Sequence, residues 1–184
     1  MLFFIDSLES LEKISHLLER ENDSSLLGID FEWKPQTCSL EPISGASLMQ
    51  IASKTFVLIF DVLKMKDDKS FKERFFKIFD KKTFLGHGMK SDINTISGDL
   101  KAFFLKKQYL DVQVIYKEKY SQFCPNLSQL CRDFLSRDLC KGEQMSNWER
   151  RPLRKRQLHY AALDAFILLK IYDKLVISKN SSAL

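Results

Sequence analysis

Two carboxylates that lie two residues apart inside an apolar segment constrain this chain more than any other feature. The segment is LGIDFEW, residues 27–33, where Asp30 and Glu32 interrupt Leu, Ile, Phe and Trp. Residues two apart on a strand point to the same face of a sheet, so both carboxylates project together. Two buried like charges are destabilising unless a cation lies between them, and carboxylate oxygens select Mg²⁺ or Mn²⁺. The alternative is an edge strand with a solvated acidic face.

The composition is that of one globular domain. The chain has 184 residues, 45% of them hydrophobic, including 15 Phe, which supplies a core. Its formal charge of +5 permits a polyanionic partner without requiring one. The four cysteines form no C-x-x-C pair, so neither a zinc site nor a redox motif is indicated.

No apolar run reaches the ~20 residues that a membrane span needs, and Asp6 interrupts the apolar start before it resembles a signal peptide. We therefore expect a soluble protein that is not secreted, with no membrane partner. The expected location is the cytoplasm, although the nucleus is also compatible. We expect one domain over residues 1–177 and a disordered tail over 178–184.

Apolar spacing and turn residues predict alternating helices and strands. A helix is expected over residues 8–20, a strand over 26–33, and a hairpin of strands 47–52 and 55–60 around Ser53-Lys54. The later elements are a helix around Phe71–Phe79, strand 83–86, helix 90–96, strand 109–110, helix 112–120, a helix from 127, and a long helix after Pro152. This order predicts an α/β fold with a mixed sheet flanked by helices.

Two further acids occur in contexts that bring them toward the early strand. Asp92 follows a predicted strand and the turn Gly86-His87-Gly88. Asp164 lies four residues after Tyr160 on one face of the last helix, whose neighbouring alanines permit close packing. Each acid alone is more often a surface residue or a helix cap. Their joint order, D-x-E, then D, then Y-x-x-x-D, indicates a common site.

These segments resemble the DEDD superfamily of 3′→5′ exonucleases, which includes ribonuclease D and the Werner exonuclease. The matching stretches are IDFEWKP, SLMQIAS, GHGMKSD and KGEQMSNWERRPLRKRQLHYAALDAFILLKIYDKL. The resemblance covers nearly the whole chain and is greatest to the Nibbler type, which trims small RNAs. It implies a ribonuclease-H-like fold.

The resemblance also implies a role for each acid. Asp30, Glu32 and Asp164 would bind one divalent cation, and Asp30 with Asp92, the latter through water, would bind a second. Such a pair activates water and stabilises the leaving oxygen. Tyr160 would orient the attacking water or help deprotonate it.

Members of the superfamily carry either a tyrosine four residues before the last acid or a histidine five residues before it. This chain has both, Tyr160 and His159. On a continuous helix, position 160 lies over 164 while 159 is turned away, which favours the tyrosine.

Substrate contacts are expected from three regions. Arg150 and Arg154 belong to the densest basic cluster and are candidates for phosphate contacts, with a solvated helical face as the alternative. Arg151 is expected to be structural, beside Trp148. The candidates for contacting the terminal nucleotide are Trp33, Leu48, Met49, Gln50, His87 and Met89, with core packing as the alternative for Trp33 and Met49.

The expected function is a metal-dependent 3′→5′ exoribonuclease that acts on single-stranded 3′ ends of small RNA. A DNA exonuclease of the same fold is one alternative. The other is an inactive RNA-binding scaffold, which the presence of all four acids and the tyrosine disfavours. The resemblance alone suggests an Argonaute protein as a partner.

Overall fold

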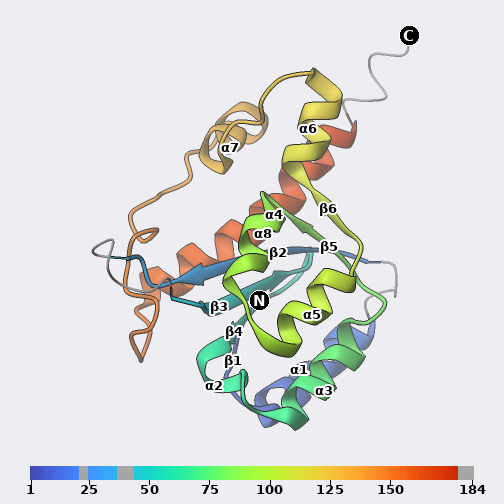
Figure 1. The fold of residues 1–184 in the computed structure, drawn as a ribbon. Helices are drawn as coiled ribbons and strands as arrows, with labels where there is room; N and C mark the ends of the chain where they lie inside the picture. Colours follow the sequence, from blue (N-terminus) through green and yellow to red (C-terminus); the bar gives the residue numbers. More distant parts are fainter. Residues whose placement is uncertain (21–24, 37–43, 178–184) are drawn as a thin grey trace.

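Six strands form a single mixed sheet at the centre of the molecule (Figure 1). The computed structural model describes residues 1–20, 25–36 and 44–177. The strands are β1 (Leu2–Ile5), β2 (Leu26–Trp33), β3 (Ala46–Ala52), β4 (Val57–Asp61), β5 (Thr83–Gly86) and β6 (Tyr109–Asp111).

Helices follow four of the six strands, and a helix is the last element that the structure describes. They are α1 (Leu8–Arg20), α2 (Val62–Met65), α3 (Lys69–Phe79), α4 (Met89–Thr95), α5 (Gly98–Lys106), α6 (Val112–Tyr120), α7 (Leu127–Leu135) and α8 (Lys155–Ile177). None of the helices within the described ranges has both the length and the hydropathy needed to cross a bilayer.

The strand order across the sheet is β1-β4-β3-β2-β5-β6. The central strands β2, β3 and β4 pair antiparallel, whereas β1 joins β4, β5 joins β2 and β6 joins β5 in parallel. This mixed arrangement is that of the predicted ribonuclease-H-like fold. It places β2, which carries the D-x-E pair, between an antiparallel and a parallel neighbour in the middle of the sheet.

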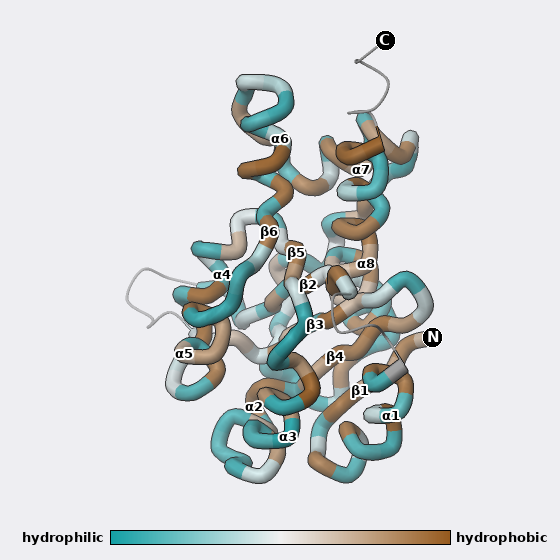
Figure 2. Tube along the Cα trace, turned by 90° about the vertical axis from the view of Figure 1, so that its right-hand side faces the viewer, coloured by the Kyte–Doolittle hydropathy of each residue, from teal (hydrophilic) through white to brown (hydrophobic). Residues whose placement is uncertain are grey.

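The two faces of the sheet are buried by different helices. Phe31, Met49 and Phe60 pack on the face covered by α1, α3 and α5, where Phe60 makes edge contacts with Phe71 and Phe75. The opposite face packs on α8, supported by α7 and α6. The tube in Figure 2 is brown along the inner strands and largely teal at the outer turns, as expected for a sheet buried on both faces.

Helix α8 lies unusually close to β2. A Cβ atom built on Gly28 would lie 2.2 Å from the backbone oxygen of Ala165, so only glycine fits at this position. Ala161 and Ala165 are fully buried along the same contact. The small residues therefore bring the helix backbone, and with it Asp164, against the strand that carries Asp30.

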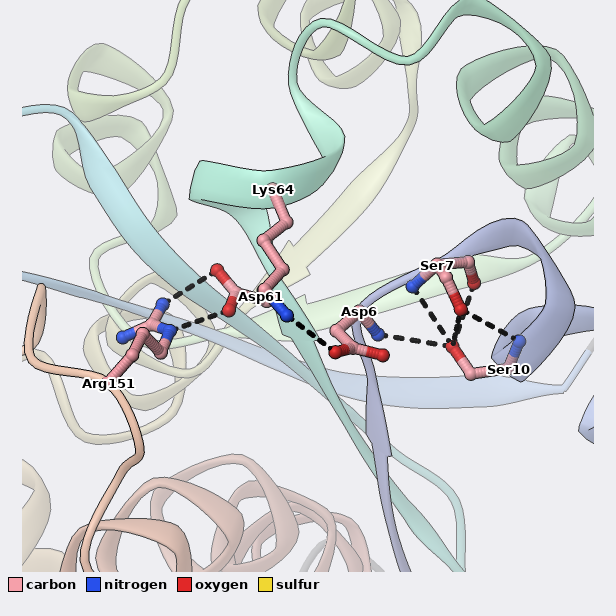
Figure 3. A network of polar contacts seen from close by, with 6 residues as sticks. All are labelled: Asp6, Ser7, Ser10, Asp61, Lys64 and Arg151. Carbon is pink, nitrogen blue, oxygen red and sulfur yellow. Dashed lines mark hydrogen bonds and ion pairs between the residues drawn. The ribbon is translucent and has the colours of Figure 1, made fainter.

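The segment that leads into α8 is fixed to the sheet by an ion pair. Nε and Nη2 of Arg151 donate to the two carboxylate oxygens of Asp61 at 2.6 and 2.7 Å, and Asp61 is fully buried (Figure 3). Nη1 of Arg151 also donates to the backbone oxygen of Trp148 at 2.8 Å. The structural role expected for Arg151 is thus confirmed by its contacts.

Three elements were not predicted from the sequence: the edge strand β1, the single-turn helix α2 and the helix α5. Several boundaries also differ, and the starts of β4 and of the last helix are two examples. Strand β4 begins at Val57, because the Ser53 hydroxyl accepts hydrogen bonds from the amides of Thr55 and Phe56 and closes the loop there. The last helix begins at Lys155, three residues after Pro152. The tail expected over 178–184 lies outside the described residues.

Candidate active site

Three carboxylates from two distant parts of the chain converge at one point. Asp30 and Glu32 project from the α8 side of β2, and Asp164 projects from α8. One oxygen from each lies within 4.8 Å of the other two. The sequence prediction that Asp164 would be brought to the D-x-E strand is therefore confirmed by the geometry.

Asp92 reaches the same pocket from α4. The turn between β5 and α4 is held by Asp111, whose carboxylate accepts hydrogen bonds from the amides of Gly88 and Met89 at 3.1 and 2.9 Å. Gly88 has φ of 75°, a left-handed conformation that favours glycine. Asp111 thus fixes the direction in which α4 leaves the sheet, and so places Asp92.

The four acids line a cavity of about 570 Å³. Its wall is mixed: aromatic and apolar side chains alternate with amides, one lysine and one histidine. Besides the acids, the lining residues are Phe31, Trp33, Pro35, Gln36, His87, Asn126, Leu127, Lys141, Gln144, Met145, Tyr160 and Leu168.

Burial and mutual repulsion raise the pKa of the site carboxyls. The pKa of Asp30 lies well above its ordinary value because the group is desolvated and faces the charges of Asp164 and Asp92. The pKa of Glu32 rises to about 10 for the same reason, burial first and the charge of Asp30 second. The pKa of Asp92 rises to about 7 through burial and the nearby Asp111. The metal-free cluster therefore holds protons at neutral pH.

The donor set fits a hard divalent cation. Oδ1 of Asp164 is buried and has no hydrogen-bond partner among the residues that the structure describes, although buried carboxylate oxygens are normally paired. Several carboxylate oxygens within a few ångströms, in a pocket open to solvent on one side, are the ligands that Mg²⁺ and Mn²⁺ prefer.

Tyr160 and His159 lie in different environments. Tyr160 is buried, lines the cavity and packs against Trp148 with a centroid distance of 5.9 Å. Burial, followed by the charge of Asp164, raises its pKa above the ordinary value. His159 is exposed and does not line the cavity. The geometry agrees with the preference for the tyrosine.

The residues expected to contact the terminal nucleotide divide into two groups. Trp33 and His87 line the cavity, and Nε2 of His87 lies 3.1 Å from the backbone oxygen of Pro125. The other four are buried within the protein and are not among the lining residues. Leu48 packs on Tyr160, Met49 lies on the opposite face of the sheet, Gln50 is fully buried beside Asp30, and Met89 is buried under Gly86.

The two arginines expected to contact phosphate lie outside the cavity wall. Arg150 is exposed, and Nη2 of Arg154 pairs with Glu143 at 2.6 Å. Their proposed role toward the substrate rests on charge alone.

Several residues of the site were not found from the sequence, and two of them carry charge. Asp111 holds the turn between β5 and α4. It could have been found as a helix cap, because it stands between a predicted strand and a predicted helix, and its side chain also accepts a hydrogen bond from the Gln113 amide. Lys141 lines the cavity from an irregular segment, where no periodicity marks it.

Comparison with known proteins decides the family. The sequence pattern of the 3′-5′ exonuclease family matches residues 4–177. The chain belongs to the 3′-5′ exonuclease family. Among curated relatives, the exonuclease mut-7 homolog of Aedes aegypti is 32% identical over 187 residues, which cover 90% of this chain. The chain spans about a quarter of that relative, 26% of its length.

Solved structures agree with this assignment. The Nibbler EXO domain of Aedes aegypti superposes with a TM-score of 0.82 at 28% identity, covering all of this chain and 90% of that one. Ribonuclease D of Trypanosoma brucei, solved in complex with the RNA U12, has a TM-score of 0.73 at 21% identity, covering 95% of this chain and 62% of that one. The exonuclease domain thus has the fold of the Nibbler EXO domain and of ribonuclease D, and its acid cluster suits a metal-dependent hydrolytic nuclease.

Proposed function

We propose that this exonuclease domain hydrolyses single-stranded RNA from the 3′ end with two divalent cations. One observation carries the proposal: four acids and one tyrosine, spread from residue 30 to residue 164, line a single cavity. An inactive relative that served only as a scaffold would have no need to keep this expensive set of buried carboxylates.

The acids divide the work of holding the cations. Asp30, Glu32 and Asp164 would hold one ion, and Asp30 with Asp92, the latter through water, would hold the second; Mg²⁺ and Mn²⁺ are the candidates. When bound, such ions lower the pKa of a water molecule and stabilise charge on the leaving oxygen. The hydroxyl of Tyr160 lies in the same cavity, where it would orient the attacking water by hydrogen bonding or help to remove its proton.

One consideration favours RNA over DNA. The exonuclease mut-7 homologs and the Nibbler EXO domain are the relatives of this chain, and a ribonuclease D of the same fold binds RNA. The cavity offers Trp33, Leu127 and Met145 as apolar surface for stacking. Stacking tolerates any base, so weak sequence preference is expected. A partner such as an Argonaute protein remains a prediction from the resemblance.

The decisive experiment is a digestion time course on matched RNA and DNA oligomers, each labelled at the 5′ or the 3′ end, with Mn²⁺, Mg²⁺ or EDTA. We expect a ladder of 5′-labelled products from RNA, immediate loss of a 3′ label, and no reaction in EDTA. Faster digestion of DNA would favour the repair-type alternative. Equal degradation by wild type and by Asp30→Asn would contradict the assignment of the site.

The tyrosine is tested with its neighbour as the matched control. Tyr160→Phe keeps the ring and its packing on Trp148 but removes the hydroxyl, so kcat is expected to fall about 10²-fold or more, the range of a positioned acid–base group. His159→Ala changes an exposed side chain on the same helical turn and should leave kcat within about twofold. The opposite ranking would assign the chain to the histidine branch.

A further inference from the structure

Lys141 places a positive charge at the edge of the acid cluster. Its Nζ lies 4.0 Å from Oδ2 of Asp164 and 5.8 Å from the centroid of the Tyr160 ring. Among the residues that the structure describes, it is the only lysine or arginine that lines the cavity. Three carboxylates, those of Asp30, Glu32 and Asp164, therefore face one ammonium group.

The segment that follows Lys141 is anchored to the start of α8. Arg154 pairs with Glu143 at 2.6 Å, and the side-chain amide of Gln157 donates to Ser146 Oγ at 2.9 Å. Trp148 is fully buried beneath this segment. The backbone at position 141 is thus held at the cavity mouth, while its long side chain, 35% exposed, keeps the freedom to turn toward solvent.

We infer that the ammonium group of Lys141 is a counter-ion for the acid cluster. It partly neutralises the carboxylates in the metal-free protein and moves away from them when divalent cations bind. The inference rests on the proposed metal site. It gives Lys141 a function that the two-metal scheme does not contain: it sets how tightly the site holds its metal. The ammonium group and the metal ion compete for the same carboxylate, Asp164.

The size of the competition follows from Coulomb's law. Moving the ammonium group away from a carboxylate 4.0 Å distant costs about 1 kcal/mol at the dielectric constant of water, which weakens metal binding roughly fivefold. Salt at physiological concentration screens part of this effect, so the measurement belongs at low ionic strength. The interaction also stabilises the metal-free fold, because the ammonium group offsets repulsion among buried carboxylates.

The test compares three variants of the whole chain. Lys141→Met removes the charge and keeps the apolar stem, and Lys141→Arg keeps the charge. Lys170→Met is the matched control, because Lys170 also lies over an aromatic ring, 5.4 Å from the centroid of Phe166, but outside the cavity. Mn²⁺ affinity is measured by calorimetric titration at low salt, and melting temperature is measured in EDTA at pH 8.

We expect Lys141→Met to bind Mn²⁺ about five- to tenfold more tightly and to melt about 2–4 °C lower in EDTA. Lys141→Arg and Lys170→Met should match wild type within about twofold in affinity. Unchanged or weaker Mn²⁺ binding by Lys141→Met overturns the inference. Asp30→Asn tests the metal site separately from the role of Lys141. If this variant binds Mn²⁺ like wild type, the proposed metal site is wrong. If it loses Mn²⁺ binding, the metal site stands, and unchanged binding by Lys141→Met contradicts only the role of Lys141.

Discussion

Glu32 makes the metal-free protein sensitive to pH, and the effect can be measured. Its pKa in the folded protein is about 10 against an ordinary value of 4.5. Because the folded pKa is raised, the group favours folding fully below about pH 4.5, and this contribution is lost as pH rises toward 10. One pKa unit corresponds to about 1.4 kcal/mol, so the 3.5 units between 4.5 and pH 8 set a ceiling of about 5 kcal/mol. Water in the open cavity solvates the ionised carboxylate and lowers this cost. We therefore expect ionisation of Glu32 to reduce the free energy of unfolding by about 2 kcal/mol at pH 8.

The variant Glu32→Gln isolates this cost, because glutamine has nearly the same shape and does not ionise. Urea unfolding in EDTA should show the variant about 2 kcal/mol more stable than wild type at pH 8 and nearly equal to it at pH 5. Glu149→Gln, an exposed control, should differ from wild type at neither pH. An equal difference at both pH values for Glu32→Gln would refute the reasoning. Saturating Mn²⁺ should reverse the order at pH 8, since the variant lacks one proposed ligand and gains less binding energy than wild type.

Three further substitutions test the packing around the site, each by urea unfolding in EDTA. Gly28→Ala places a methyl group against the Ala165 carbonyl and should cost about 3 kcal/mol, with loss of nuclease activity; a variant of wild-type stability would contradict the close approach. Asp61→Ala leaves Arg151 without its buried partner and should also cost about 3 kcal/mol, whereas a cost below about 1 kcal/mol would indicate a weak pair. Gln50→Leu removes two buried amide atoms that lack partners and should raise stability by about 1 kcal/mol; a decrease would mean that the amide binds water.

The sequence predicted the core of the fold because its signals are local. Strand 26–33, strand 83–86 and helix 112–120 have the predicted bounds, because the residues of each element differ locally from the turn residues beside it. Strand β1 was not predicted, because Leu2–Ile5 is short and its partner, Val57–Phe60 of β4, lies more than fifty residues away. Helix α5 was not predicted either; it begins at Gly98, a residue type that is unfavourable in helices.

The acids were identified for a different reason. Asp30 and Glu32 violate the apolar pattern of their strand, and such a violation is visible without a structure. Lys141 violates nothing, since a lysine in a polar loop is ordinary. Its position beside Asp164 depends on how the chain between α7 and α8 folds back over Tyr160, which only tertiary contacts determine.

The contact between Gly28 and Ala165 also bears on how the site moves. With no side chain between strand and helix, the two backbones touch directly, and the relative position of the acids they carry is not cushioned by rotating groups. Thermal displacement of the helix and of the sheet should therefore be shared, so that Asp30 and Asp164 move as one body. Adjustment to cations of different radius is then left to Glu32, Asp92 and the side chains at the rim.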